Sequence, residues 1–523
     1  MFKQFPLGGY RKKATGVTMI PASGIGVYSL KPVHKLNYIE GSTWSGDQEI
    51  GRIYYDQVVN TQHTEGVANI KISVDQLKKH LPNCKWIALV VGWFLDFNTK
   101  ECVPMIETKR KERLEVINVD GEKYYRTILE DVIVDDDEYR MKVEEKTVFY
   151  GEESVTFLAV TSSLDDYWKV GNWTRENARL ISDGMYGETP SDIEVLDAIR
   201  FFKEQGFKVC FYPFLFGYDT DKPWRGRLHF NYADEVNDFM SKDNGFNNFI
   251  KHYVDLLSTH NVEVDAFLVG SEMRGLTMSA PPTFPAVQHL IDLVMYTKQK
   301  LPNTKVSYAA DWSEYHSDYA TGIRHLDRLW KYCDMVCIDA YFPLTESHTE
   351  NFYEIYNGWT SGEHYDWVYR DAENGDFTKI TISPEYAWKN LKFWWENEHY
   401  NPDGTKTDWI PRSKKIWFSE LGFSCVHSAT VQPNIFVDTT SVEGGYPRGS
   451  TKETNFVVQA IALDASLEFL RKQEWLEEVF IWTWDARPYP AFPRDPFWTD
   501  GVNWEKGHWI NGKFVSDEVL YIM

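Results

Sequence analysis

The chain has 523 residues, of which 43% are hydrophobic and 16% aromatic, and its formal net charge is −22. Single cores stop growing near ~250–300 residues, so this length predicts one large domain with appendages. The strong negative charge argues against nucleic acid or an anionic membrane surface as the main partner. No run of about 18 apolar residues occurs, so we expect no segment that inserts into a membrane.

The six cysteines are scattered along the chain. Cys333 and Cys337 are four residues apart, but no second Cys/His pair completes a metal site. We therefore expect reduced and mostly buried thiols, no metal and no cofactor. The first residues are basic but are not followed by the apolar segment of a secretory signal. These features fit a protein that folds in the reducing cytoplasm.

The first half of the chain is less regular than the second. Residues 1–60 have scattered Gly, Pro and Ser and are interpreted as a lead-in or a partial module. Residues 86–94 form a continuous apolar run, as expected for a strand that is buried on both faces. Residues 106–150 are charged and alternating, which predicts a β-rich insertion. We expect the main domain to span residues 61–513 and a short tail to span residues 514–523.

Strand and helix patterns alternate from about residue 155 onward. A helix is predicted at residues 189–206, with Thr189 as its cap and Asp192 completing a capping box. A second helix is predicted at residues 284–301, where apolar residues recur at helical spacing. The strand candidates lie at residues 86–94, 155–160, 207–216, 265–272, 306–312, 334–341, 414–420 and 478–485. Eight strands alternating with helices predict an α/β fold of the (β/α)8 TIM-barrel type. An open doubly wound sheet is the alternative, but no Gly-rich phosphate loop follows any strand.

Two of the strand candidates end on a glutamate. FLVGSE ends at Glu272 and KKIWFSE ends at Glu420. Catalytic residues of such barrels lie at the C-terminal ends of the strands. Cleavage of a glycosidic bond requires two carboxyl groups, one that donates a proton and one that is ionised. Glu272 and Glu420 are therefore the predicted catalytic pair.

Other polar and aromatic residues at the strand ends are predicted to bind substrate. Aromatic faces suit the C–H faces of sugar rings, and the N–H and O–H groups of Trp and Tyr can reach sugar hydroxyls. The candidates are Trp93, Tyr212, Trp224, Arg225, Arg274, Asp311, Trp312, Asp339, Tyr341, Trp482, Trp484, Asp485 and Arg487. Arg274 is expected to point away from Glu272 if the strand continues, with the alternative that it curls back and holds a carboxylate ionised. We expect Tyr341 to donate a hydrogen bond to a nucleophilic Glu, and the segment from Trp484 to cover the barrel mouth. A barrel in which these residues form structural ion pairs is the alternative.

Several long motifs carry a resemblance to a known family. FLVGSEMRGLT, VSYAADWSEY, IDAYFPL, IWFSELGF and WTWDARPYPAFP occur in this order within roughly residues 80–513. In these motifs the chain resembles the glycoside-hydrolase-like TIM-barrel domain of gene transfer agent and phage tail proteins, which belongs to the baseplate hub. The resemblance implies a polysaccharide or peptidoglycan-type glycan as substrate and other phage-like tail proteins as partners, without nucleic acid or membrane insertion. It also implies synthesis in the cytoplasm followed by assembly into a tail or virion particle.

The barrel also resembles the retaining clan A glycosidases, which place a general acid Glu after strand four and a nucleophile Glu after strand seven. The resemblance implies that Glu272 is the acid/base and Glu420 the nucleophile. One residue departs from the pattern, because Ser271 stands where the clan usually has Asn. Three functions stay open: a glycosidase, a carbohydrate-binding barrel without catalysis, and a structural piece of the hub. A retaining enzyme requires carboxyl groups about 5–5.5 Å apart, and an inverting one about 6.5–9.5 Å.

Overall fold

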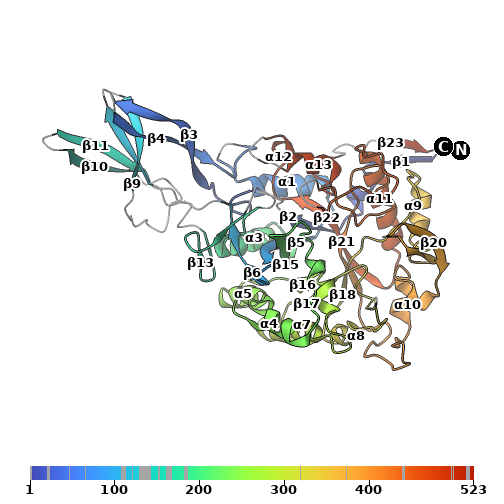
Figure 1. Ribbon diagram of the computed structural model, residues 1–523. Coiled ribbons are helices and arrows are strands. Elements are labelled where there is room, and N and C mark those ends of the chain that lie inside the picture. Colours follow the sequence, from blue (N-terminus) through green and yellow to red (C-terminus); the bar gives the residue numbers. More distant parts are fainter. Residues whose placement is uncertain are drawn as a thin grey trace. The chain divides into compact units, whose positions relative to one another are not determined.

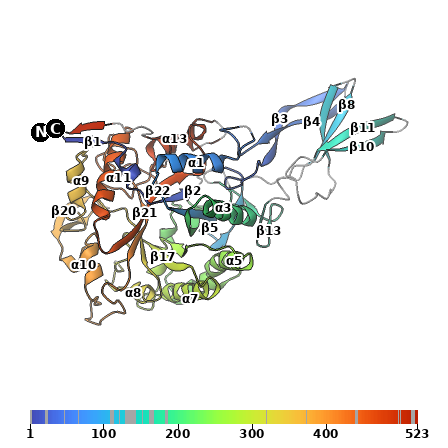
Figure 2. The same ribbon diagram turned by 180° about the vertical axis from the view of Figure 1, so that it is seen from behind.

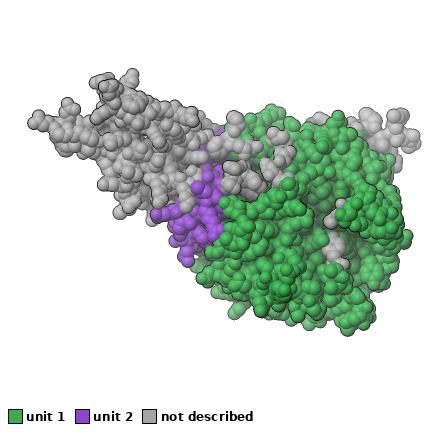
Figure 3. All heavy atoms as spheres, in the orientation of Figure 1, with its two compact units in different colours: residues 1–20, 73–103, 199–523 green, residues 21–72, 104–198 purple. Residues whose placement is uncertain are grey.

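A computed structural model describes most of the chain, and it divides into two compact units (Figure 3). The first unit comprises residues 1–20, 73–103 and 199–523, and the second comprises residues 21–72 and 104–198. The described residues are 3–20, 24–45, 48–64, 66–107, 113–119, 122–128, 143–150, 153–160, 168–181, 187–318, 320–372, 374–438, 442–495, 498, 500–513 and 519–522.

Eight parallel strands of the first unit close into a barrel (Figures 1 and 2). In the order in which they pair around the barrel they are β2 (Gly16–Ile20), β5 (Trp86–Asp96), β15 (Lys208–Tyr218), β16 (Ala266–Ser271), β17 (Lys305–Asp311), β18 (Val336–Asp339), β21 (Ile416–Leu421) and β22 (Leu476–Asp485). β22 pairs with β2 and so completes the circle. The predicted (β/α)8 barrel is confirmed.

Two of the sequence-based assignments are wrong. The run at residues 155–160 is not a barrel strand, because it lies in β11 (Glu153–Val160), which pairs antiparallel with two strands of the second unit. The first barrel strand is instead β2, which lies within the predicted lead-in at residues 1–60. β2 is only five residues long, too short to show a period, whereas residues 155–160 have the apolar, β-branched composition that fits any buried strand.

Helices alternate with the barrel strands along the chain. They are α1 (Asn69–His80), α3 (Asp192–Glu204), α4 (Ala233–Ser241), α5 (Phe246–Thr259), α6 (Arg274–Thr277), α7 (Pro285–Lys300), α8 (Asp327–Trp330), α9 (Phe352–Gly358), α10 (Leu391–Glu396) and α11 (Phe456–Leu470), with α12 (Ala491–Arg494) and α13 (Gly501–Lys506) after the last strand. The predicted stripe of α7 is confirmed, because Val287, Leu290, Ile291 and Val294 are all buried. Among the described residues no helix has the length and apolar character needed to cross a membrane.

The predicted cap of α3 is displaced by two residues. Ser191 accepts a hydrogen bond from the N–H of Glu194 at 3.3 Å, and the Glu194 carboxylate accepts from the N–H of Ser191 at 2.7 Å. This reciprocal pair is the capping box. Thr189 instead accepts from the N–H of Met105, and Asp192 from the N–H of Gly171. Thr189 and Ser191 both have side chains that can cap a helix. Thr189 is used by a loop contact, so Ser191 caps α3.

The second unit is mainly antiparallel β structure. β3 (His34–Ser45) pairs with β4 (Gln48–Val58), and a four-stranded sheet has the order β10-β11-β8-β9. The other members of this sheet are β8 (Arg113–Val119), β9 (Glu122–Ile128) and β10 (Val143–Tyr150). Strands β8, β9 and β10 therefore occupy much of the region where the sequence predicts a β-rich insertion. Elsewhere in the second unit, a buried ion pair joins Arg175 to Glu188 through two hydrogen bonds of 3.0 and 2.7 Å.

The remaining short elements flank the barrel. β6 (Glu101–Val103) pairs antiparallel with the end of β5, and β19 (Trp367–Asp371) forms a hairpin with β20 (Asp376–Thr381). β1 (Lys3–Pro6) pairs with β23 (Val519–Ile522) near the two chain ends (Figure 1). The barrel interior is filled by aromatic and aliphatic side chains from its strands, including Tyr212, Tyr341 and Trp482. The barrel is therefore a packed core whose polar groups gather at one end.

Candidate active site

Glu272 directly follows β16 in a strained backbone conformation. Its φ of 48° lies in the left-handed region, which a non-glycine residue adopts only at a cost of about 1–3 kcal/mol. Its N–H donates to the carbonyl of Ala309 on β17 at 2.8 Å, which holds this conformation in place. The pairing register of the two strands also shifts between Leu268 and Ser271. The strand end is therefore shaped to direct the Glu272 carboxylate.

Glu420 lies within β21, beside a second irregularity. The pairing of β18 with β21 shifts after Ile338, so that Asp339 pairs with Glu420. Successive side chains of a regular strand face opposite sides. Here the Ser419 hydroxyl donates to Oδ1 of Asp339 at 2.7 Å, and Glu420 also reaches the Asp339 side chain through Tyr212. Such an irregularity redirects side chains, and it brings both residues of the Ser-Glu pair toward one site.

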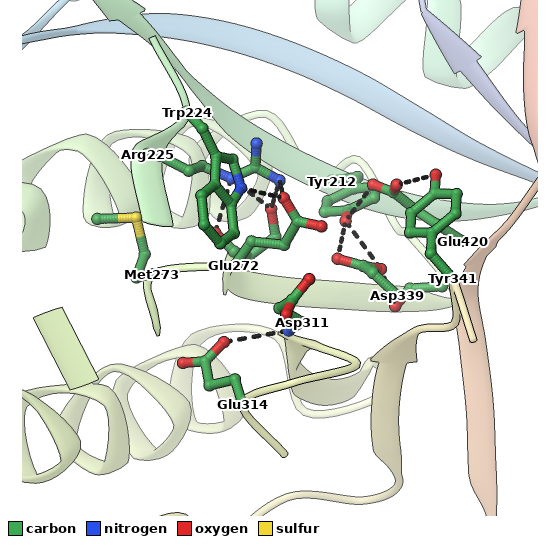
Figure 4. A network of polar contacts seen from close by, with 12 residues as sticks. Tyr212, Trp224, Arg225, Glu272, Met273, Asp311, Glu314, Asp339, Tyr341 and Glu420 are labelled. Carbon is green, nitrogen blue, oxygen red and sulfur yellow. Dashed lines mark hydrogen bonds and ion pairs between the residues drawn. The ribbon is translucent and has the colours of Figure 1, made fainter. Parts of the chain in front are cut away.

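Three carboxyl groups meet at this end of the barrel (Figure 4). One oxygen from each of Glu272, Asp339 and Glu420 lies within 4.8 Å of the other two. The exposed fractions are 8% for Glu272, 0% for Asp339 and 2% for Glu420. Three acids so close together and so deeply buried cannot all be ionised without a large cost.

Two tyrosine hydroxyls hold Glu420 at both of its oxygens. Tyr212 donates to Oε1 at 2.8 Å, and Tyr341 donates to Oε2 at 2.5 Å. The expected bond from Tyr341 is therefore present. Burial and the negative charges of the carboxylates raise the pKa of both phenols well above the usual value. The two tyrosines therefore keep their protons and act as hydrogen-bond donors.

Glu272 is held by residues of the loop after β15. Nε1 of Trp224 donates to Oε2 of Glu272 at 2.9 Å, and the Arg225 guanidinium forms an ion pair with the same oxygen at 3.0 Å. Arg225 also donates to the carbonyl and the hydroxyl of Ser271 at 2.8 and 2.6 Å. The guanidinium lies over the Phe214 ring, 3.6 Å from its centre. Arg274 donates to the Ser313 hydroxyl, and its charge acts against the burial that raises the pKa of Asp311, so the carboxyl group that it favours in the ionised form is Asp311.

The electrostatics of the cluster follow from burial and from mutual repulsion. Burial, and next the charge of Glu272, raise the pKa of Glu420 to about 8. The hydrogen bonds from the two tyrosines and the charge of Arg225 act in the opposite direction. Burial, followed by the charges of Glu420 and Glu272, raises the pKa of Asp339 well above its usual range. The cluster therefore retains protons to higher pH than isolated carboxylates do.

The spacing of the three carboxyl groups would also suit a divalent cation. The donor set does not favour one. Tyr212, Tyr341 and Trp224 already donate to the oxygens that a cation would need, and Arg225 supplies a positive charge beside Glu272. These donors and the positive charge of Arg225 compete with a cation for the carboxylates, so the arrangement favours proton chemistry.

Comparisons with known families match the barrel. Residues 244–493 match the family model of the GTA TIM-barrel-like domain. Residues 175–281 match the model of Glycoside Hydrolase Family 113. The barrel is glycoside-hydrolase-like. Both matches include Glu272, and the first also includes Asp339 and Glu420. No curated protein matches the chain.

Solved structures with a similar barrel include several glycoside hydrolases. A Family 113 β-1,4-mannanase has 12% identity over 96% of each chain, with a TM-score of 0.47. A Family 113 β-mannanase from Alicyclobacillus acidocaldarius has 16% identity over 63% of this chain and 77% of that chain, with a TM-score of 0.36. Xylanase 10B from Thermotoga maritima has 9% identity over 56% of this chain and 68% of that chain, with a TM-score of 0.26.

Further predicted residues of the glycoside-hydrolase-like barrel lie around the carboxyl cluster. Asp311 ends β17, and burial followed by the charge of Glu272 raises its pKa to about 6. Trp312 is half-buried and packs edge-on against Trp388 and His364, with ring centres 6.0 and 5.0 Å away. Trp482 lies in the barrel core and stacks on Phe214 at 5.9 Å.

Four predicted substrate-binding residues lie elsewhere. Trp93 points outward from β5, where its Nε1 donates to Tyr253 on α5 at 2.8 Å. Trp484 is 1% exposed and its Nε1 donates to Ser73 of α1 at 2.9 Å, so it does not cover the barrel mouth. These corrections have one reason. Alternation along a strand separates two faces, but it does not tell which face lies inside the barrel.

Asp485 and Arg487 are structural. Arg487 is 1% exposed and forms ion pairs of 2.7 Å with both Asp485 and Asp500. Its guanidinium also lies 3.7 Å from the centre of the Phe492 ring. This network fastens the segment after β22, and the prediction that the two residues bind substrate is wrong.

The sequence reasoning missed two serines and one acid. Ser271 anchors Arg225, and Ser419 donates to Asp339. Glu314 is fully buried and accepts hydrogen bonds from Tyr308 and Thr277 behind Asp311. A signal for the serines was present, because the strand segments that end on Glu272 and Glu420 both end in Ser-Glu.

Proposed function

We propose that the protein hydrolyses the glycosidic bonds of a polysaccharide with retention of configuration. The observation that carries this proposal is the approach of Glu272 and Glu420, whose nearest oxygens lie within 4.8 Å in the barrel. Retaining enzymes separate the two carboxyl groups by about 5–5.5 Å, and inverting enzymes by about 6.5–9.5 Å to admit a water. The short approach supports retention.

The two glutamates have surroundings that suit different roles. Both oxygens of Glu420 are fixed by phenol hydroxyls, which favour the ionised form and hold it for attack. Glu272 is less buried, and its carboxyl group points toward the other two acids (Figure 4). A leaving group bound near the opening would meet Glu272 first. Glu420 is therefore the nucleophile and Glu272 the acid/base.

The reaction balances with these two residues alone. The Glu420 carboxylate forms an ester bond to the anomeric carbon while the glycosidic C–O bond breaks, and Glu272 gives its proton to the leaving oxygen. Glu272 then takes a proton from a water molecule, which attacks the anomeric carbon and frees Glu420. When Glu272 holds its proton, the repulsion that raises the pKa of Glu420 is removed, so protonation of one glutamate favours ionisation of the other.

Isosteric variants test this function. We expect Glu272→Gln and Glu420→Gln each to lower the release of reducing ends from an active polysaccharide by at least about 10³-fold. Glu478→Gln is the matched control, because Glu478 lies at the opposite end of β22 and binds Trp86. The substrate panel should contain peptidoglycan, bacterial surface polysaccharides and β-1,4-mannan. Glycan binding without turnover in the unchanged protein would instead support a carbohydrate-binding barrel.

Chemical rescue separates the roles of the two glutamates. Azide should restore turnover of substrates with good leaving groups in Glu272→Ala, because such groups need little protonation. The product should be the β- or α-azide with the configuration of the substrate. Rescue of Glu420→Ala with retained configuration would show that the roles are reversed.

We also propose that the protein works in a phage-like tail, where it opens or grips glycan on a recipient cell. Support comes from the match to the GTA TIM-barrel-like domain and from the motif resemblance. It would be made in the cytoplasm and bind other tail proteins during assembly. An antibody against the barrel should label purified particles from the source, and label found only in the soluble cell fraction would refute this setting.

A further inference from the structure

The Tyr212 hydroxyl lies between two buried carboxyl groups and has a single hydrogen to donate. Its oxygen is 2.8 Å from Oε1 of Glu420 and 3.1 Å from Oδ2 of Asp339. An ionised carboxylate can only accept hydrogen bonds. If both acids were ionised, the phenol hydrogen could be donated to only one of them. The carboxylate of the other acid would then contact the phenol oxygen with no hydrogen between the two oxygen atoms. One of the two carboxyl groups must therefore carry a proton.

Neither water nor the nearby Arg225 cation relieves the contact between the phenol oxygen and the second carboxylate. Tyr212 and Asp339 are 0% exposed and Glu420 is 2% exposed, so bulk water does not solvate the three groups. The Arg225 guanidinium donates to Ser271 and contacts Oε2 of Glu272, so it does not supply the missing hydrogen between Tyr212 and the two acids. A buried acceptor that faces another acceptor costs about 1–3 kcal/mol or more, which a single proton removes.

The distances place this proton on Asp339. The Tyr212 hydroxyl is 2.8 Å from Glu420 but 3.1 and 3.3 Å from the two oxygens of Asp339, which assigns its own hydrogen to Glu420. Both oxygens of Glu420 already accept short bonds, at 2.8 Å from Tyr212 and 2.5 Å from Tyr341. On Asp339, Oδ1 accepts from Ser419 at 2.7 Å, while Oδ2 faces Tyr212. A hydroxyl at Oδ2 can donate to the Tyr212 oxygen, whose own hydrogen points to Glu420. Every hydrogen then has one acceptor.

We propose that Asp339 is a positioning residue that holds a buried proton and, through Tyr212, keeps Glu420 ionised for attack. The proton follows from the hydrogen count, whereas its use in catalysis rests on the function proposed above. The direction of the pKa shift agrees, because burial and the charges of Glu420 and Glu272 favour neutral Asp339. The titratable and charged groups that face Asp339 are Tyr212, Glu272, Glu420, Arg225, Tyr341 and Cys337.

This assignment also balances the buried charge. With protons on Asp339 and on the acid Glu272, the site holds one carboxylate, Glu420, and one guanidinium, Arg225. Buried charges are tolerated when they are matched in this way. Loss of the Asp339 proton would add an unmatched negative charge beside the nucleophile and would remove the donor that orients Tyr212.

Infrared spectroscopy locates the proton without a substrate. A protonated carboxyl group has a carbonyl stretch that an ionised one lacks, and carbon-13 in the side-chain carboxyl of aspartate shifts that band. We expect a band near neutral pH that shifts with labelled aspartate and is absent from Asp339→Asn. Bands that shift only with labelled glutamate belong to other acids such as Glu272 or Glu314. A spectrum in which no band shifts with labelled aspartate, or in which Asp339→Asn leaves the aspartate-sensitive bands unchanged, would place the proton elsewhere and overturn the proposal.

A pair of variants tests the catalytic use of the proton. Asparagine is neutral at every pH and its amide can donate to Tyr212, whereas alanine cannot. We expect Asp339→Asn to be at least about 10-fold more active than Asp339→Ala, and Tyr212→Phe to lose about 10- to 100-fold relative to the unchanged protein. Equal activities of the Asn and Ala variants would show that a neutral donor to Tyr212 gives no catalytic advantage and would overturn the catalytic use of the proton. Absence of turnover in the unchanged protein would defeat the proposed function, while the infrared band would still decide the position of the proton.

Discussion

Removal of the Tyr341 hydroxyl should raise the pH at which the enzyme loses activity on the acid side. Tyr341 donates to Oε2 of Glu420 at 2.5 Å in a site that is closed to solvent. A hydrogen bond to a charged group contributes about 1.5–3 kcal/mol, and 1.36 kcal/mol corresponds to about one pKa unit. Tyr341→Phe should therefore raise the pKa of Glu420 by about 1–2 units.

The sign of the change in activity follows from the role of Glu420. The nucleophile must be ionised, and a higher pKa leaves less of it ionised at any given pH. As the pH falls, kcat/KM should be lost about 1–2 pH units earlier in Tyr341→Phe than in the unchanged protein. At pH values well above this acid-side loss, the activity of Tyr341→Phe should return to most of that of the unchanged protein. The assay is the pH dependence of kcat/KM on an active polysaccharide.

A second buried tyrosine serves as the matched control. Tyr253 is 0% exposed, and its hydroxyl accepts a hydrogen bond from Trp93 outside the barrel interior. Tyr253→Phe should cost about 1–3 kcal/mol of stability because it leaves a buried N–H without an acceptor, but it should not move the acid limb. The Tyr341 ring packs edge-on against Phe436 at 5.3 Å, so the phenylalanine ring should keep its place. A loss of activity in Tyr341→Phe that is the same at every pH would refute the reasoning.

Three further outcomes can be measured. Arg487→Ala should lower the free energy of unfolding by about 3–5 kcal/mol in urea titrations, because it removes the buried guanidinium that forms ion pairs with Asp485 and Asp500. A changed KM with unchanged stability would restore its substrate role. Trp482→Phe should lower kcat/KM by about 10-fold, because this ring faces the barrel interior. Trp484→Phe should lower only the stability, by about 1 kcal/mol, because its Nε1 donates to Ser73 outside the barrel. Equal effects of the two variants on kcat/KM would contradict these positions. Burial raises the pKa of Glu314 to about 8, so the folded state binds more protons than the unfolded state from about pH 4.3 upward, and stability falls as the pH rises. Glu314→Gln should therefore reduce this slope by up to about 1.4 kcal/mol per pH unit between about pH 5 and pH 8, and an unchanged slope in urea unfolding would show that Glu314 is ionised throughout.

The sequence by itself determined the barrel class and the strand-end positions of Glu272 and Glu420. These features are encoded locally, because a continuous apolar run specifies a buried strand and a charged residue at its end must lie at the barrel rim. The helical stripe of α7 is local in the same sense. The hydrogen bond from Tyr341 to Glu420 was predictable because their strands are neighbours in chain order.

Only the tertiary structure decided which strands, faces and partners are used. β2 became the first barrel strand because it pairs with β5 and β22, which a five-residue segment does not reveal. Trp484 faces α1 and Trp482 faces the barrel interior, a distinction that depends on strand register. Arg225 rather than Arg274 reaches Glu272 because a loop folds back over the strand end.

The contact of the Tyr212 hydroxyl with two carboxyl groups is the feature that the sequence could predict least. It requires Tyr212, Asp339 and Glu420, from three strands, to converge within hydrogen-bond distance. A sequence pattern specifies the conformation of each segment and the spacing along it. Whether one hydroxyl meets one acid or two depends on differences of less than an ångström across the barrel, which are set only when all eight strands close.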